Sequence, residues 1–71
     1  MFGHEDWILK IRGREVTARV VLLAGGHGTL TSYQVTGGPS QIGLQVLVES
    51  RQDATDQIEA LLCKLLGDGW N

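Results

Sequence analysis

The chain has 71 residues, of which 42% are hydrophobic and 20% are charged, and its formal net charge is −2. This balance is too apolar for a disordered tail, and the length leaves room for a single domain, residues 1–71. A chain this short buries only about 60% of its unfolded surface, so such domains often add a disulfide, a metal or a partner subunit. The sequence holds one cysteine and no Cys/His cluster. We therefore expect no cofactor and a homodimer or larger homo-oligomer.

The start of the chain and its cysteine content bear on the compartment. No apolar run approaches the ~18 residues of a membrane span. The N-terminus, Met1-Phe2-Gly3-His4-Glu5-Asp6, lacks the basic start of a signal peptide. A single unpaired cysteine also fits a reducing compartment. These features predict a cytoplasmic protein with no membrane segment, whose residues 1–6 form a flexible N-terminus.

Two stretches of alternating apolar residues flank Gly13-Arg14, a dipeptide that suits a two-residue hairpin turn of type II′. In this register Arg12 faces Glu15, and Ile11 faces Val16. Successive side chains of a strand point to opposite faces. One face of the hairpin is then apolar and is expected in the core: Trp7, Leu9, Ile11, Val16, Ala18, Val20 and Leu22. The other face is expected to be largely polar and basic: Ile8, Lys10, Arg12, Glu15, Thr17 and Arg19.

Two further strands are predicted over residues 29–36 and 42–49, between glycine-rich breaks. In the first of them, Tyr33 and Val35 are expected on the covered face. Its outer face would carry Leu30, Ser32, Gln34 and Thr36. In the second, one face is formed by Ile42, Leu44, Val46 and Val48. Short connections make neighbouring strands antiparallel, so residues 7–49 are predicted to form a four-stranded meander.

The last third of the chain changes to helical spacing, with apolar residues at Ala54, Ile58, Leu61, Leu62 and Leu65. This spacing predicts a helix over residues 53–66, with Ser50 or Asp53 as N-cap and Gly67 as a left-handed C-cap. Leu66 widens the apolar stripe to about 140°, more than one sheet needs. The excess is covered by Trp70 folding back from the tail, residues 67–71, or by a second subunit, and we favour Trp70. The predicted class is α+β: an antiparallel four-stranded meander with one C-terminal helix packed on one face, ββββα in two layers.

The segment that most resembles a ligand site is Gly25-Gly26-His27-Gly28-Thr29. A phosphate-binding loop needs a helix directly after it, and a strand is predicted there instead. His27 has no carboxylate or nucleophile near it in the sequence, and Cys63, expected to be partly exposed on the helix, has no nearby base. Three adjacent residues at the terminus, His4-Glu5-Asp6, do not make a metal cage. We therefore predict no catalytic, cofactor-binding or metal site, and a protein that is not an enzyme.

Charge is distributed unevenly along the chain. Residues 8–23 hold four basic residues against Glu15, a net +3, and residues 49–71 hold two basic against five acidic residues, a net −3. A basic sheet face could contact phosphates. The strand–strand–strand–helix order also resembles, in topology, DNA-binding domains that lay an antiparallel sheet in the major groove, such as integrase arm-binding domains. Against this, the pI is near 5.5 and no aromatic side chain is expected on that face for base stacking.

The preferred hypothesis is a small non-enzymatic protein-interaction domain that self-associates through the outer sheet face or a sheet edge. Residues 42–49, as a terminal strand, would offer such an edge. The apolar residues expected at an oligomer interface on the outer face are Ile8, Val21, Leu23, Leu30 and Leu47. The alternative hypothesis is a nucleic-acid-binding domain. It would use the four basic residues of the first hairpin: Lys10, Arg12, Arg14 and Arg19.

Overall fold

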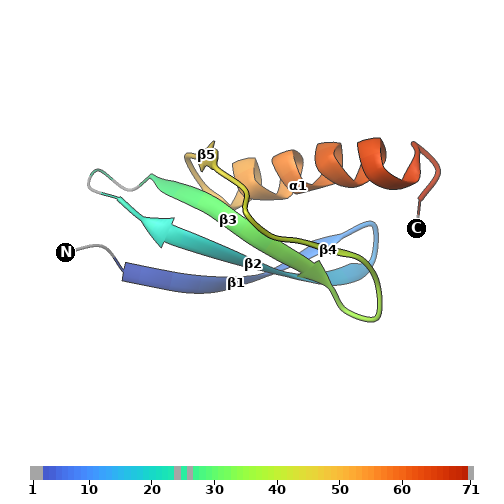
Figure 1. Cartoon of the computed structure of the whole chain (residues 1–71), viewed down its shortest axis with the longest axis horizontal. Coiled ribbons are helices and arrows are strands. Elements are labelled where there is room, and N and C mark those ends of the chain that lie inside the picture. The colour runs from blue at the N-terminus through green and yellow to red at the C-terminus, as the bar shows by residue number, and fades with distance from the viewer. Residues whose placement is uncertain (1–2, 24, 26, 71) are drawn as a thin grey trace.

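The computed structural model describes residues 3–23, 25 and 27–70. This part of the chain forms an antiparallel sheet and one helix: β1 (Gly3–Ile11), β2 (Arg14–Leu22), β3 (Gly28–Val35), β4 (Ser40–Gln41), β5 (Val46–Val48) and α1 (Arg51–Leu66). The strand order is β1-β2-β3-β4, and β5 also pairs with β3. Figure 1 shows α1 running along one side of the sheet. The predicted α+β class, an antiparallel meander with a C-terminal helix on one face, is confirmed.

The first hairpin turns at Arg12-Gly13, one residue earlier than predicted. Lys10 lies opposite Glu15, so the predicted pairing of Arg12 with Glu15 is wrong. Arg12 and Gly13 both have positive φ, 53° and 78°, as in a type I′ turn rather than the predicted type II′. The pairing shifts by two residues, an even number, so every strand side chain keeps its face. The predicted core set of the hairpin is accordingly buried, apart from the partly buried Leu22.

A β-bulge in β3 changes which residues face the core. Arg19 lies opposite Ser32, but Val20 lies opposite Leu30, which leaves Thr31 as an extra residue. The inserted residue reverses the alternation, so Leu30 is fully buried. The prediction that Leu30 lies on the outer face, at an oligomer interface, is therefore wrong. Beyond the bulge, Tyr33 and Val35, which were predicted for the covered face, are buried as expected.

The predicted fourth strand, residues 42–49, is a strand only over β5. The other short strand, β4, lies just before the predicted range, and a break separates the two. Gly43 in the break has a φ of +72°, and Ile42 beside it is 84% exposed. The prediction that Ile42 shares a face with Leu44, Val46 and Val48 is therefore wrong. Val48 is fully buried, and the other two pack against the core. Both short strands pair with β3, so together they occupy the place expected for one strand.

Helix α1 begins two residues earlier than predicted, after the N-cap Ser50. The Ser50 Oγ accepts a hydrogen bond from the backbone N–H of Asp53 at 3.0 Å. The Asp53 carboxylate in return accepts one from the backbone N–H of Glu49 at 3.0 Å. This reciprocal arrangement satisfies two backbone donors at the helix start. At the other end Gly67 has φ 94° and ψ 164°, a positive φ but not the left-handed helical conformation that was predicted.

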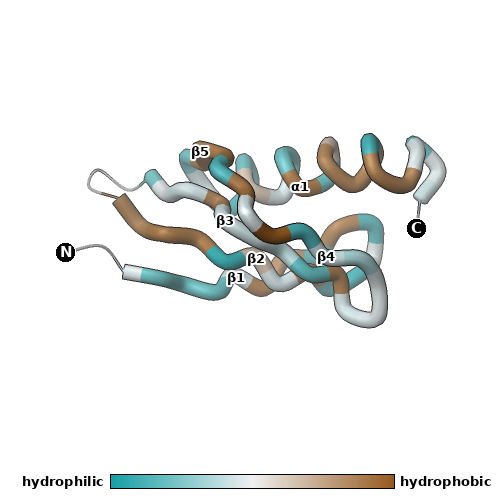
Figure 2. Tube along the Cα trace, viewed as in Figure 1, coloured by the Kyte–Doolittle hydropathy of each residue, from teal (hydrophilic) through white to brown (hydrophobic). Residues whose placement is uncertain are grey.

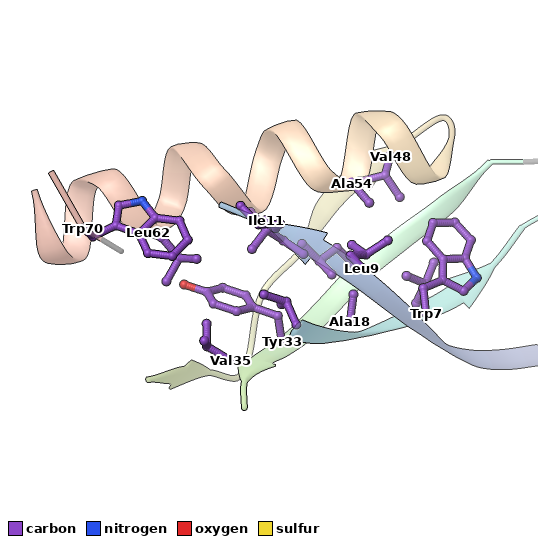
Figure 3. Packing of buried hydrophobic residues seen from close by; sticks show 14 residues of the cluster. Trp7, Leu9, Ile11, Ala18, Tyr33, Val35, Val48, Ala54, Leu62 and Trp70 are labelled. Atoms are coloured by element: carbon purple, nitrogen blue, oxygen red, sulfur yellow. The ribbon is translucent and has the colours of Figure 1, made fainter. Parts of the chain in front are cut away.

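The core lies between the sheet and α1, with a tryptophan at each end (Figure 3). The helix contributes three fully buried residues: Ala54, Ile58 and Leu62. Trp70 is only 7% exposed, which confirms that the tail folds back over the core. Leu65 and Leu66 nevertheless remain 50% and 49% exposed. The tail thus covers only part of the wide apolar stripe of the helix.

Tyr33 links the core to β4 and gives a first testable prediction. It is the only tyrosine of the chain, and its hydroxyl donates to Gln41 Oε1 at 2.5 Å. Burial raises the pKa of Tyr33 above its ordinary value of 10.0. A raised folded-state pKa means that the neutral phenol contributes stability below pH 10.0, and that this contribution is lost as the pH rises through the folded pKa.

We therefore expect tyrosinate absorbance to appear at higher pH in the folded protein than in the urea-unfolded chain. The free energy of unfolding should fall over the same alkaline range. The Tyr33→Phe variant should lose this part of the pH dependence. Equal titration midpoints for the folded and unfolded chains would contradict the prediction.

Candidate interaction surface

The face of the sheet opposite α1, here called the outer face, carries alternate residues of β1 and β2. Across these two strands Asp6 lies opposite Arg19, and Lys10 lies opposite Glu15. The Arg19 Nε donates to Asp6 Oδ1 at 3.2 Å, with both side chains more than half exposed. Such an exposed pair contributes roughly 0–1 kcal/mol. The charges on this part of the outer face cancel in pairs, so it is not the basic face that was predicted.

The four basic residues of the first hairpin are divided between two sides of the molecule. Lys10 and Arg19 lie on the outer face, as predicted. Arg14 has the strand parity of the core residues and lines a hollow of about 120 Å³ beside Trp70. Arg12 reaches from the turn toward α1, so its predicted place on the outer face is wrong. A nucleic-acid contact by each residue stays a prediction, but the four do not form one patch.

Arg12 instead holds the C-terminal segment against the turn of the first hairpin. Its Nε donates to Glu59 Oε2 at 2.9 Å, and its Nη1 donates to the backbone oxygens of Asp68 at 2.6 Å and Trp70 at 2.9 Å. The guanidinium carbon lies 4.9 Å from the centre of the Trp70 ring. We call these four residues the Arg12 clamp. Its contacts join residues that lie 47 to 58 positions apart in the sequence, so a local sequence pattern could not predict them.

An open, uncharged hollow lies at the other end of the outer face. It measures about 540 Å³ and is lined by apolar residues together with two threonines and a glutamine. The apolar residues are Val21, Leu23, Leu44 and Leu47. Figure 2 shows the strongly hydrophobic end of β2 that leads into this region. Three of the five residues predicted for an oligomer interface therefore meet here, whereas Ile8 stands apart on β1.

The two edges of the sheet differ in length and continuity. β1 is first in the strand order, so one side of its nine residues pairs with β2 and the other side pairs with no described strand. The opposite edge is formed by β4 and β5, of two and three residues. The terminal position predicted for this part of the chain is confirmed, but its edge is interrupted at Gly43. β1 is therefore the longer template for an added strand.

The glycine-rich segment is a connection between β2 and β3. Ala24 and Gly26 lie outside the described residues. The backbone oxygen of His27 accepts a hydrogen bond from the backbone N–H of Leu23 at 2.9 Å. Gly28 is the first residue of β3, so a strand follows the segment, as predicted, and not a helix.

The other residues considered for chemistry have structural neighbours. Cys63 is partly exposed, as predicted, and its Sγ lies 3.6 Å from Arg12 Nη2. His4, Glu5 and Asp6 belong to β1, which begins at Gly3, so the predicted flexibility of residues 3–6 is wrong. Residues 1–2 of that predicted segment lie outside the described residues. Within residues 3–23, 25 and 27–70, no three His, Cys, Asp or Glu side chains are grouped so that they could hold a metal ion.

The fold and surface define a two-layer α+β domain with one face of its sheet uncovered. Over the described part of the chain, no helix is both long enough and apolar enough to cross a membrane. Comparisons with protein-family models, with curated proteins and with solved structures gave no match to this chain. Function is therefore inferred from the surface itself.

Proposed function

We propose that this chain is a small, non-enzymatic protein-interaction domain that forms a homodimer through the uncovered side of its sheet, by the outer face or by an edge. The observation that carries the proposal is the exposure of large apolar side chains on that side. Ile8 is 57% exposed and Leu47 is 59% exposed. Leu47 belongs to the contiguous apolar lining of the hollow, a kind of surface that soluble monomers seldom leave in water and that a second subunit would cover.

The small size of the domain supports the same proposal. A core of this size supplies only about 3–5 kcal/mol, and association adds stability by binding the folded state alone. The hollow beside Leu47 has no charged lining residue, so association there would depend little on salt. We further propose that the protein acts in the cytoplasm, because its one cysteine, Cys63, fits a reducing compartment.

The nucleic-acid alternative has less support from the arrangement of the basic residues. Only Lys10 and Arg19 share the outer face, and Arg19 pairs with Asp6. Duplex DNA binding weakens by about 0.9 log unit per phosphate contact for each log unit of salt. A steep fall in the affinity for DNA with rising salt would therefore favour nucleic-acid binding, whereas a homodimer held together at the apolar hollow should respond weakly to salt.

The proposal is tested by sedimentation velocity or light scattering across a dilution series. We expect a dimer, and we expect either Ile8→Asp or Leu47→Asp to raise its dissociation constant at least about tenfold, because a buried charge opposes association. Loss with Ile8→Asp indicates the β1 side, and loss with Leu47→Asp indicates the hollow. Leu66→Asp is the matched control, since Leu66 is a half-exposed leucine on the helix.

Two results would contradict the proposal. The first is a strict monomer at high micromolar concentration. The second is a dimer that only Leu66→Asp dissociates, which would assign the interface to the helix and not to the sheet.

A further inference from the structure

The free edge of β1 presents the backbone groups of alternate residues. A two-residue hairpin closes with a hydrogen-bonded pair, here Ile11 and Arg14, and bonded and non-bonded pairs alternate from there. The hydrogen bond from the backbone N–H of Thr36 to the backbone oxygen of Glu15 agrees with this alternation, because it places the Glu15 backbone on the β3 side. The β1 residues whose N–H and C=O groups point to the free edge are therefore His4, Asp6, Ile8 and Lys10.

The same residues carry a self-complementary charge pattern on the outer face. Asp6 and Lys10 lie at equal distances on either side of Ile8 along β1. When two identical strands pair antiparallel about a two-fold axis at Ile8, Asp6 of each copy faces Lys10 of the other, and Ile8 faces its own copy. Opposite charges at such cross-strand positions stabilise a sheet, and like charges destabilise it.

The charges of β2 extend this match across four strands. Within one chain Glu15 lies opposite Lys10, and Asp6 lies opposite Arg19. In the paired sheet, four side chains would lie in one line across the four strands. In order they are Glu15 and Lys10 of one copy, then Asp6 and Arg19 of the other, so the charges along the line alternate in sign. The two-fold axis generates a second line of four charges in the same order. Between the two lines lie the two Ile8 side chains, each of which is 57% exposed in the single chain.

We infer that the homodimer forms by antiparallel pairing of β1 with β1 of a second copy, centred on Ile8, to give one continuous sheet. This inference rests on the proposed function, and it selects one of the sites named there. Centring the pair on Asp6 would place that carboxylate against its own copy, and centring it on Lys10 would oppose two ammonium groups. Centring it on Trp7 or Leu9 would place Ile8 opposite a charged residue.

Cross-linking tests the register directly. With Cys63→Ser as background, Ile8→Cys leaves one thiol at the axis, where facing Cα atoms of a bonded pair lie about 5.5 Å apart, within disulfide range. Lys10→Cys on the same strand is the matched control, because its two copies would lie four residues apart, about 13 Å. We expect Ile8→Cys to form a disulfide dimer under mild oxidation at least about tenfold faster than Lys10→Cys.

Charge reversal tests the pairing without a cross-link. Asp6→Lys and Lys10→Asp should each raise the dimer dissociation constant about tenfold or more, because each makes both lines of charges repulsive. An equimolar mixture of the two variants should restore association, since both pairs that face each other across the β1–β1 contact are then opposite in charge. The like-charge pairs created with Arg19 or Glu15 lie within each chain and are the same before and after mixing. Sedimentation of each variant and of the mixture measures this.

The outcomes separate this inference from the proposed function. A native chain that stays monomeric at high micromolar concentration overturns both. A native dimer in which the two cysteine variants cross-link at equal rates, or in which mixing the charge variants restores nothing, overturns the β1 pairing and leaves the homodimer standing. If circular dichroism shows that Ile8→Cys does not fold, the mixture of charge variants decides alone.

Discussion

Replacing Arg12 with alanine should lower the free energy of unfolding by about 2 kcal/mol, or the Tm by roughly 10 °C for a chain this short. The variant loses the ion pair with Glu59, two hydrogen bonds to backbone oxygens and the stacking on Trp70. The Arg12 side chain is 30% exposed, so solvent screens the ion pair and the expected loss is less than the sum of its contacts. Urea unfolding followed by tryptophan fluorescence measures the change.

The matched control for this variant is Arg19→Ala. Arg19 also forms an ion pair, with Asp6, but its side chain is 61% exposed, so its loss should cost less than about 1 kcal/mol. Arg12→Lys keeps the charge and the turn geometry but lacks the planar fork of donors, and it should recover less than half of the loss. If Arg12→Ala and Arg19→Ala lose the same stability, the Arg12 clamp contributes no more than a surface ion pair.

A second large effect is expected at Gly28, the first residue of β3. A Cβ added there would lie 2.4 Å from Val20 Cγ1 and 3.2 Å from the backbone oxygen of Val21. Val20 is fully buried, so it could move only by displacing its neighbours in the core. Gly28 also pairs with Val48, the last residue of β5, so a shift of β3 would disturb the end of the fifth strand. Gly28→Ala should therefore destabilise the fold by about 2 kcal/mol.

Gly69→Ala is the control for Gly28→Ala. A Cβ at Gly69 would have no neighbouring atom within 4 Å, and its backbone φ lies outside the positive range. Its unfolding free energy should stay within about 0.5 kcal/mol of the parent value. Thermal unfolding of both variants by circular dichroism gives the comparison. A Gly28→Ala variant as stable as Gly69→Ala would show that β3 can move away from Val20 at little cost.

The hairpin shows how far sequence periodicity predicts this fold. The alternation of apolar residues correctly assigned Trp7 and Val20 to the core, although the predicted turn was one residue late. The late turn shifts the strand pairing by two residues, and a shift by an even number leaves every side chain on the same face of the sheet. Helical spacing likewise located Ile58 against the sheet. Both patterns are local and repeat many times, so one misplaced residue does not remove the signal.

Features that break the periodicity could not be predicted in this way. The bulge at Thr31 inserts one residue, and composition does not mark its position, so Leu30 was assigned to the wrong face. The break at Gly43 divides a stretch whose alternation continues through it. Arg12 was placed on the outer face from strand parity, but it belongs to the turn, where parity no longer fixes direction.

Part of the candidate surface could also be predicted from the alternation of strand side chains. Val21, Leu23 and Leu47 were assigned to the outer face by parity and do meet there. The free edge was predicted at the other side of the sheet, because the sequence does not reveal that β4 and β5 are too short and interrupted to act as a template. Gly28 was considered only as part of the glycine-rich segment that resembles a ligand site, whereas its close approach to Val20 gives a packing reason for glycine.

The Arg12 clamp has a consequence for the order in which the molecule matures during translation. The first hairpin is local and can form as soon as it leaves the ribosome, but its arginine must wait for partners 56 and 58 positions downstream. Until Trp70 has been synthesised, this side chain cannot pack over the apolar face of the hairpin, which stays partly exposed. The apolar face of the hairpin therefore gains its full cover only when the C-terminal segment packs against it.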